Sequence, residues 1–297
     1  MKQIKHTRPI TVKMIRKVIS VFYQIKSKRY QYHYKKCATI YGLNPGETRP
    51  IPIVVSLTTF PARIESVALT IKSLMDQSMK PDKIVLYLGE DVREVPDSLE
   101  QLKPYGLEIH FVPGNLKPHK KYFYALEEYP EAILITADDD IMYDRRFIEV
   151  LYACHLRNPG AVVAHRVHKM LKQDVELLPY AEWSYEDWSM PNKPSFSLFA
   201  TGCAGVLYPP GSICRSSNDL QDIVEYCLNA DDVWLKFKEL EHSVPVVWTG
   251  RRGYMEIREH QRTGLAQTNV NAGGNDSYID AMQQLTGILL RDYAAEN

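Results

Sequence analysis

The sequence lacks any hydrophobic run long enough to cross a membrane. Such a span requires about 20 consecutive apolar residues, and none is present among the 297 residues. A signal-peptide core followed by a small-residue cleavage site is also missing. Close cysteine pairs and zinc-finger spacings are absent too, because the five cysteines are scattered along the chain. An odd, scattered set is typical of reduced thiols, so we expect a cytoplasmic protein.

Acidic residues are absent from residues 1–46, a segment that we call the basic arm. It contains eleven Lys or Arg, whereas the remaining chain carries 25 basic and 36 acidic residues. Its apolar residues recur at helical spacing: Met14, Ile15, Val18, Ile19, Phe22 and Ile25. Such a cationic amphipathic helix favours an anionic membrane surface, here the inner face of the plasma membrane. The alternatives are a helix docked on the protein body and nucleic-acid binding. Because no RNA- or DNA-binding motif accompanies the charge, we expect no nucleic-acid partner.

Apolar, β-favouring segments alternate with helical patterns after a linker rich in Gly and Pro at residues 42–52. The predicted strands cover residues 51–59, 83–88, 107–112, 132–137 and 161–167, and the predicted helices cover 64–75, 117–129 and 145–156. Strands that alternate with helices are typical of a doubly wound sheet. The sequence therefore predicts an α/β fold with a mainly parallel sheet.

Three adjacent aspartates, Asp138, Asp139 and Asp140, follow the buried strand that ends at residue 137. Open α/β sheets bind their ligands at the carboxyl ends of their strands. Adjacent carboxylates repel one another, so without a counter-ion at least one should hold its proton more tightly. Mg²⁺ or Mn²⁺ would remove this conflict, because both prefer oxygen ligands and share them with a diphosphate. We predict a divalent metal site here, with an acidic helix cap as the alternative.

Further polar side chains follow the other predicted strands. Hydroxyls and a guanidinium come after the first strand, and two acids follow the second: Ser56, Thr58, Thr59, Arg63, Glu90 and Asp91. The basic run 117–121 precedes the acidic strand and offers cations and an imidazole for a diphosphate. These groups predict a nucleotide site. Capped helices, a surface turn and a solvated basic face are the alternatives.

The second half of the chain contains another acidic pair, Asp231 and Asp232, at the start of a predicted helix. Acids in a first helical turn are stabilised by the helix dipole, which would by itself explain them. The segment 180–188 concentrates aromatic and acidic residues, a composition that suits sugar rings or a packed loop. Two glycines in residues 199–210 allow the backbone to pass close to a ligand.

The order of four segments resembles bacterial glycosyltransferases of the GT-A fold that act in capsule, O-antigen or lipopolysaccharide assembly. The segments are Val-Ser-Leu-Thr-Thr-Phe-Pro-Ala-Arg-Ile, Lys-Ile-Val-Leu-Tyr-Leu, His-Lys-Lys-Tyr-Phe-Tyr-Ala-Leu and Ile-Thr-Ala-Asp-Asp-Asp-Ile. The similarity covers about residues 51–280. It implies one GT-A-like catalytic domain over residues 47–297. Its nucleotide-binding half would be residues 51–160, and its acceptor-side half, mixed in strand direction, residues 161–297.

The resemblance also implies a reaction and roles for particular residues. A hexose would move from a nucleotide-sugar, here a UDP-sugar, to a glycan or lipid-linked glycan, with Mn²⁺ or Mg²⁺ as cofactor. The implied metal ligands are Asp138, Asp140 and His260. The implied donor-site residues are Thr58, Arg63, Glu90, His119, Lys120, Asp138 and Asp139. Either Asp231 or Asp232 would be the general base of an inverting transfer, although a retaining enzyme could use the same acids.

Two other classes of protein compete with this hypothesis. A sugar nucleotidyltransferase should show a Gly-rich, basic loop after the first strand, where this chain has Thr-Thr-Phe-Pro at residues 58–61. A non-catalytic carbohydrate- or nucleotide-sugar-binding protein would not need two separate acidic sites. Metal-dependent nucleotide binding together with turnover would distinguish a transferase from the latter.

Overall fold

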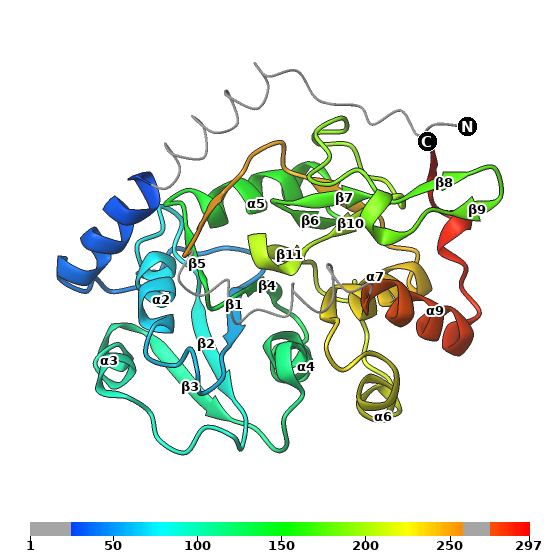
Figure 1. Cartoon of the computed structure of the whole chain (residues 1–297). Coiled ribbons are helices and arrows are strands. Elements are labelled where there is room, and N and C mark those ends of the chain that lie inside the picture. The colour runs from blue at the N-terminus through cyan, green and yellow to red at the C-terminus, as the bar shows by residue number, and fades with distance from the viewer. Residues whose placement is uncertain (1–24, 258–273) are drawn as a thin grey trace.

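The computed structural model describes residues 25–257 and 274–297, and a central β-sheet organises this part of the chain (Figure 1). The seven strands found there run in the order β12-β6-β11-β4-β1-β2-β3. They are β1 (Ile53–Thr58), β2 (Lys83–Leu88), β3 (Leu107–Phe111), β4 (Ile133–Ala137), β6 (Val162–Ala164), β11 (Val206–Tyr208) and β12 (Val246–Trp248). Neighbouring strands are parallel except that β11 runs antiparallel to β4 and β6. This arrangement confirms the predicted α/β fold with a mainly parallel sheet.

Side chains of β1 enter two separate cores, because successive residues of a strand point to opposite faces of the sheet. Ile53, Val55 and Leu57 pack with the helices α2 (Val67–Met75) and α5 (Phe147–Arg157). Val54 packs on the other face with α4 (Lys120–Glu128) and α7 (Asp231–Glu241). Burial on both faces explains why these strands read as nearly continuous apolar runs.

Short elements of both halves complete the described fold. Two antiparallel pairs join β7 (Val167–Lys169) to β10 (Leu198–Ala200) and β5 (Ile141–Tyr143) to β13 (Tyr254–Glu256). A third small sheet contains β8 (Leu171–Gln173), β9 (Glu176–Leu177) and β14 (Ala295–Glu296). The remaining helical segments are α3 (Asp97–Glu100), η1 (Lys103–Tyr105), η2 (Lys117–His119), η3 (Tyr180–Glu182), η4 (Gly202–Ala204), α6 (Asp219–Asp222), η5 (Ile223–Cys227), α9 (Gly274–Thr286) and η7 (Leu290–Asp292). Within the described ranges, no helix is both long enough and apolar enough to span a membrane.

The described end of the basic arm is docked on the body of the protein. Residues 25–36 are helical, whereas most of the predicted amphipathic helix lies outside the described residues. Tyr34 is only 2% exposed and packs against the β5–β13 pair. Its hydroxyl donates a hydrogen bond to Asp76 over 3.3 Å, and its carbonyl accepts one from Lys72 over 3.2 Å. Exposed cations of this helix are Lys28, Arg29, Lys35 and Lys36.

Candidate functional site

A cavity of about 700 Å³ lies at the carboxyl ends of the central strands. The parallel register of β1 and β4 aligns Leu57 with Ala137, so the polar residues that follow each strand are neighbours. The cavity contains most of the predicted site, namely Thr58, Arg63, Lys120, Asp138, Asp139, Asp140, Asp231 and Asp232. The two acidic segments, which lie far apart in the sequence, therefore meet at one place.

Asp139 is held by groups of the protein itself. Arg63 Nη1 lies 2.6 Å from Asp139 Oδ1 and 3.1 Å from Asp140 Oδ2. The Thr59 hydroxyl donates a hydrogen bond to the other oxygen of Asp139 over 2.7 Å. Because both oxygens of this buried carboxylate are engaged, Asp139 fixes the loop after β4 and positions its neighbours.

Lys121 joins the two acidic segments. Its side-chain ammonium Nζ lies 2.5 Å from Asp138 Oδ1 and 2.8 Å from Asp231 Oδ2, and the residue is 2% exposed. Burial lowers the pKa of Lys121, but the charges of Asp138 and Asp231 outweigh it and raise the pKa well above its usual value. A permanent positive charge thus links the end of β4 to the start of α7.

The two acids at the start of α7 have opposite pKa shifts. Burial raises the pKa of Asp231, but the charge of Lys121 outweighs it and lowers the pKa. Burial and the negative charge of Asp231 raise the pKa of Asp232 to about 8. Asp232 also accepts a hydrogen bond from the backbone N–H of Gly202 over 2.8 Å. At neutral pH, Asp231 is therefore ionised and Asp232 is mainly protonated.

Gly202 is needed at this position because its backbone passes very close to the acidic pair. A Cβ atom there would lie 2.8 Å from Asp232 Oδ1 and 3.0 Å from Lys121 Nζ. The sequence analysis expected a glycine in this segment to allow close approach to a ligand. In the structure the close approach is to the side chains that line the cavity.

Asp138 and Asp140 show the charge conflict that the sequence predicts. Burial, followed by the charge of Asp138, raises the pKa of Asp140 to about 7, and burial is the main cause of the raised pKa of Asp138. In the described part of the chain, no three His, Cys, Asp or Glu side chains are arranged to hold a metal ion. His260, a predicted ligand, lies outside the described residues. The two carboxylates fit a divalent cation that takes further oxygen ligands from a diphosphate and water.

Two predicted donor-site residues do not line the cavity. His119 is fully buried, and its Nε2 and Nδ1 lie 2.9 Å and 2.5 Å from the Cys227 carbonyl and the Tyr122 hydroxyl. Burial lowers the pKa of His119 to about 4, so the ring is neutral and ties α4 to η5. Glu90 is exposed at the end of β2 and is not a lining residue, whereas the adjacent Asp91 is. His119 is therefore enclosed by the protein, and Glu90 lies outside the lining of the cavity.

Several residues that line the cavity could not be assigned to the site from the sequence. Lys121 was seen only as part of a basic run, and the second half of the chain adds Arg166, His168, Tyr180, Tyr185, Thr201, Cys203, Asn229 and Asn275. Arg166 donates to Cys203 Sγ over 2.9 Å and lies 3.3 Å from a Glu186 carboxylate oxygen. Tyr185 stacks on His168 with ring centroids 4.3 Å apart. In the sequence, the aromatic content of residues 180–188 and the two glycines of residues 199–210 pointed toward this side.

No protein-family model matches the chain, and no curated protein matches it. Among solved structures, the chain is similar to residues 1–349 of S. aureus TarS in complex with UDP, with 13% identity and a TM-score of 0.45. It is also similar to the same TarS segment in complex with UDP-GlcNAc, with 13% identity and a TM-score of 0.47. Each match covers 69% of this chain and 60% or 58% of the TarS chain. The chain thus spans less than two thirds of the length of these relatives.

Proposed function

We propose that this chain is a glycosyltransferase that moves a hexose from a nucleotide-sugar to a glycan or lipid-linked glycan acceptor. The main support is the meeting of Asp138, Asp140, Asp231 and Asp232 in one cavity, with Lys121 between the two acidic segments. Asp138 and Asp140 are suited to bind a cation together with a diphosphate. Asp231 and Asp232 are suited to act as a general base. By the resemblance described above, the donor is a UDP-sugar and the acceptor belongs to a surface polysaccharide.

The donor side of the cavity offers cations for a diphosphate. Lys117 and Lys120 line it, and Lys120 is held by a hydrogen bond to Asn115 over 3.0 Å. Asp138 and Asp140 would hold Mn²⁺ or Mg²⁺, which supplies positive charge to the departing diphosphate when bound. Thr58 and Arg63 complete this side, where they would lie close to the nucleotide.

On the acceptor side, Asp232 is the proposed general base. It takes the proton of an acceptor hydroxyl while that oxygen forms a bond to the anomeric carbon of the donor. The bond from this carbon to the diphosphate oxygen breaks, and the nucleoside diphosphate leaves with the electron pair. A raised pKa makes Asp232 the stronger base of the pair, because proton transfer is most effective near the operating pH. This single displacement inverts the anomeric centre.

Calorimetric titration with UDP, GDP, CDP and dTDP, each with and without Mn²⁺, tests the donor site. We expect one nucleotide, UDP, to bind at least about tenfold more tightly with Mn²⁺. Hydrolysis of the matching nucleotide-sugar would then separate a transferase from a non-catalytic binding protein. A folded protein that binds none of the four nucleotides contradicts the proposed function.

Asp140→Asn should abolish the effect of Mn²⁺ on UDP binding. The side chain keeps its shape but loses the charge that attracts a divalent cation. Folding should persist, because the pKa of Asp140 is raised to about 7 and its neutral form is already well populated at neutral pH. Glu90→Gln is the matched control, since Glu90 does not line the cavity. An unchanged response to Mn²⁺ in Asp140→Asn would remove Asp140 from the metal site.

The basic arm is proposed to hold the enzyme on an anionic membrane surface. Each Lys or Arg near such a surface contributes about 1 kcal/mol. Lys28→Gln/Arg29→Gln should therefore weaken cosedimentation with phosphatidylserine vesicles about tenfold or more at low salt. The double variant Arg93→Gln/Lys193→Gln removes two exposed charges elsewhere. Equal binding by both double variants would argue against a membrane-facing arm.

A further inference from the structure

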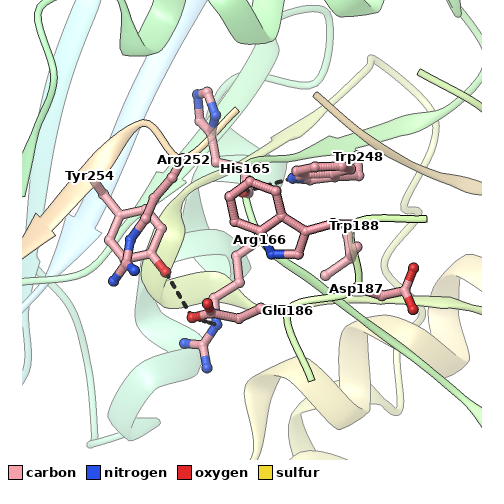
Figure 2. Close-up of a pocket in the computed structure, with 9 residues that line it drawn as sticks. His165, Arg166, Glu186, Asp187, Trp188, Trp248, Arg252 and Tyr254 are labelled. Atoms are coloured by element: carbon pink, nitrogen blue, oxygen red, sulfur yellow. Dashed lines mark hydrogen bonds and ion pairs between the residues drawn. The ribbon is translucent and has the colours of Figure 1, made fainter. Parts of the chain in front are cut away.

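A shallow second pocket, with a volume of only about 10 Å³, has an exposed tryptophan in its lining (Figure 2). Trp188 is 61% exposed, whereas the other three tryptophans of the chain are at most 5% exposed. Its ring meets Trp248 edge to face, with centroids 5.3 Å apart. Trp248 is itself fixed, because its indole N–H donates to the His165 carbonyl over 3.1 Å. Trp188 therefore presents an aromatic face to solvent from a supported position.

Charged side chains of Glu186 and Arg252 line the same pocket as Trp188. A Glu186 carboxylate oxygen lies 3.3 Å from Arg166 Nε and accepts a hydrogen bond from the Tyr254 hydroxyl over 3.4 Å. The Arg252 guanidinium lies over the Tyr254 ring at 4.6 Å. An apolar partner covering this pocket would remove these charges from water at a large cost. A ligand with an apolar face and a rim of hydroxyls fits both the aromatic face of Trp188 and the charged side chains.

The pocket and the main cavity share one lining residue and one loop. Arg166 lines both, and residues 183–188 contribute Tyr185 to the cavity and Trp188 to the pocket. The connecting Glu186 has a φ of +47°, a left-handed conformation that is costly for a residue other than glycine. Its backbone N–H donates to His168 Nδ1 over 3.0 Å, which fixes this turn. The loop thus places one aromatic ring in each compartment.

We infer that Trp188, with Glu186 and Arg252, forms an outer saccharide subsite for an acceptor of at least two sugar units. One pyranose ring stacks its C–H face on the indole of Trp188. The hydroxyls of this sugar form hydrogen bonds with the Glu186 carboxylate and the Arg252 guanidinium. The inner unit then lies in the main cavity near Tyr185, with its reacting hydroxyl toward Asp232. This inference rests on the proposed function and specifies its acceptor as an oligosaccharide.

The test uses the full chain and neutral oligomers of glucose, galactose, mannose and N-acetylglucosamine with one to six units. Binding is measured by calorimetry and by acrylamide quenching of tryptophan fluorescence. We expect at least one series to bind more tightly with length and to protect Trp188 from quenching. Trp188→Ala should weaken binding of the longest oligomer about tenfold. The affinities for the monosaccharide and for UDP should not change. Trp188→Phe should keep most of the affinity.

Phe111→Ala is the matched control, because Phe111 is 60% exposed at the far edge of the sheet. Equal affinities of the Trp188→Ala and Phe111→Ala variants for the longest oligomer would overturn the subsite. UDP binding without binding of any oligomer would also overturn it, as would self-association that is lost in Trp188→Ala. Failure of the unaltered protein to bind UDP would instead count against the proposed function.

Discussion

Asp232→Asn is expected to lower turnover of the nucleotide-sugar by roughly 10²–10⁴-fold, the range observed when a general base is lost. Donor affinity should change little, because Asp232 accepts a hydrogen bond from the Gly202 N–H and lies on the proposed side of the sugar acceptor. Turnover and donor affinity are measured separately, by product formation at saturating donor and by calorimetry with UDP. An equal loss in both would contradict a role as base.

Asp231→Asn is the informative comparison, because this acid is ionised and paired with Lys121 over 2.8 Å. Its removal should disturb Lys121 and hence Asp138, so donor affinity and turnover should both fall. If Asp231→Asn instead reduced turnover alone, by more than Asp232→Asn, the roles of the two acids would be exchanged.

The pH dependence of the unaltered enzyme provides a second test of Asp232. Its pKa is raised to about 8, so the base form becomes populated only as pH rises through that value. We expect kcat/KM to increase with pH, with an apparent pKa near 8, and this rise should vanish in Asp232→Asn. Stability should move the other way. The contribution of Asp232 is complete below the unfolded carboxyl pKa of about 4 and is lost as pH rises through about 8.

Lys121→Met is expected to destabilise the fold and to weaken donor binding together. The change leaves Asp138 and Asp231 without their shared cation, and breaking a buried ion pair costs roughly 3–5 kcal/mol in the free energy of unfolding. Urea unfolding measures this loss. It should be smaller at pH 5 than at pH 8, because the two carboxylates can then take up protons.

Lys120→Met is the control for this prediction. Lys120 is also buried, but its hydrogen bond is to the Asn115 amide oxygen and burial lowers its pKa. Its loss should reduce diphosphate affinity without a comparable loss of stability. If Lys120→Met and Lys121→Met were equally stable, the bridge between Asp138 and Asp231 would not stabilise the fold.

The sheet could be predicted from the sequence because its buried strands are nearly continuous apolar runs. The predicted strand at residues 83–88 matches β2 at Lys83–Leu88, and the first strand is only slightly shorter than expected. Helix starts were less accurate. The helix predicted from residue 117 begins as α4 at Lys120, after the short 3₁₀ segment η2 that contains Pro118. A proline favours such a first turn and gives no local signal for where the regular helix begins.

The positions of the acids could be predicted, but their partners could not. Lys120 and Lys121 are adjacent in sequence, and a helix separates adjacent side chains by about 100°. One therefore reaches Asn115, and the other reaches Asp138 and Asp231. His119 resembled a ligand in the sequence because nothing local shows the distant Cys227 carbonyl that its ring meets. The partner of each of these side chains is set by contacts between segments that are distant in the sequence.

The antiparallel strand β11 has a practical consequence for protein engineering. It lies between β4 and β6, so hydrogen bonds run without interruption from the strands of the first half of the chain to those of the second half. A chain divided near residue 160 would leave β4 with an open edge and expose its backbone groups to aggregation. Chimeras that combine the donor preference of one enzyme with the acceptor preference of another should therefore exchange surface loops such as residues 183–188, and should keep all seven strands from one parent.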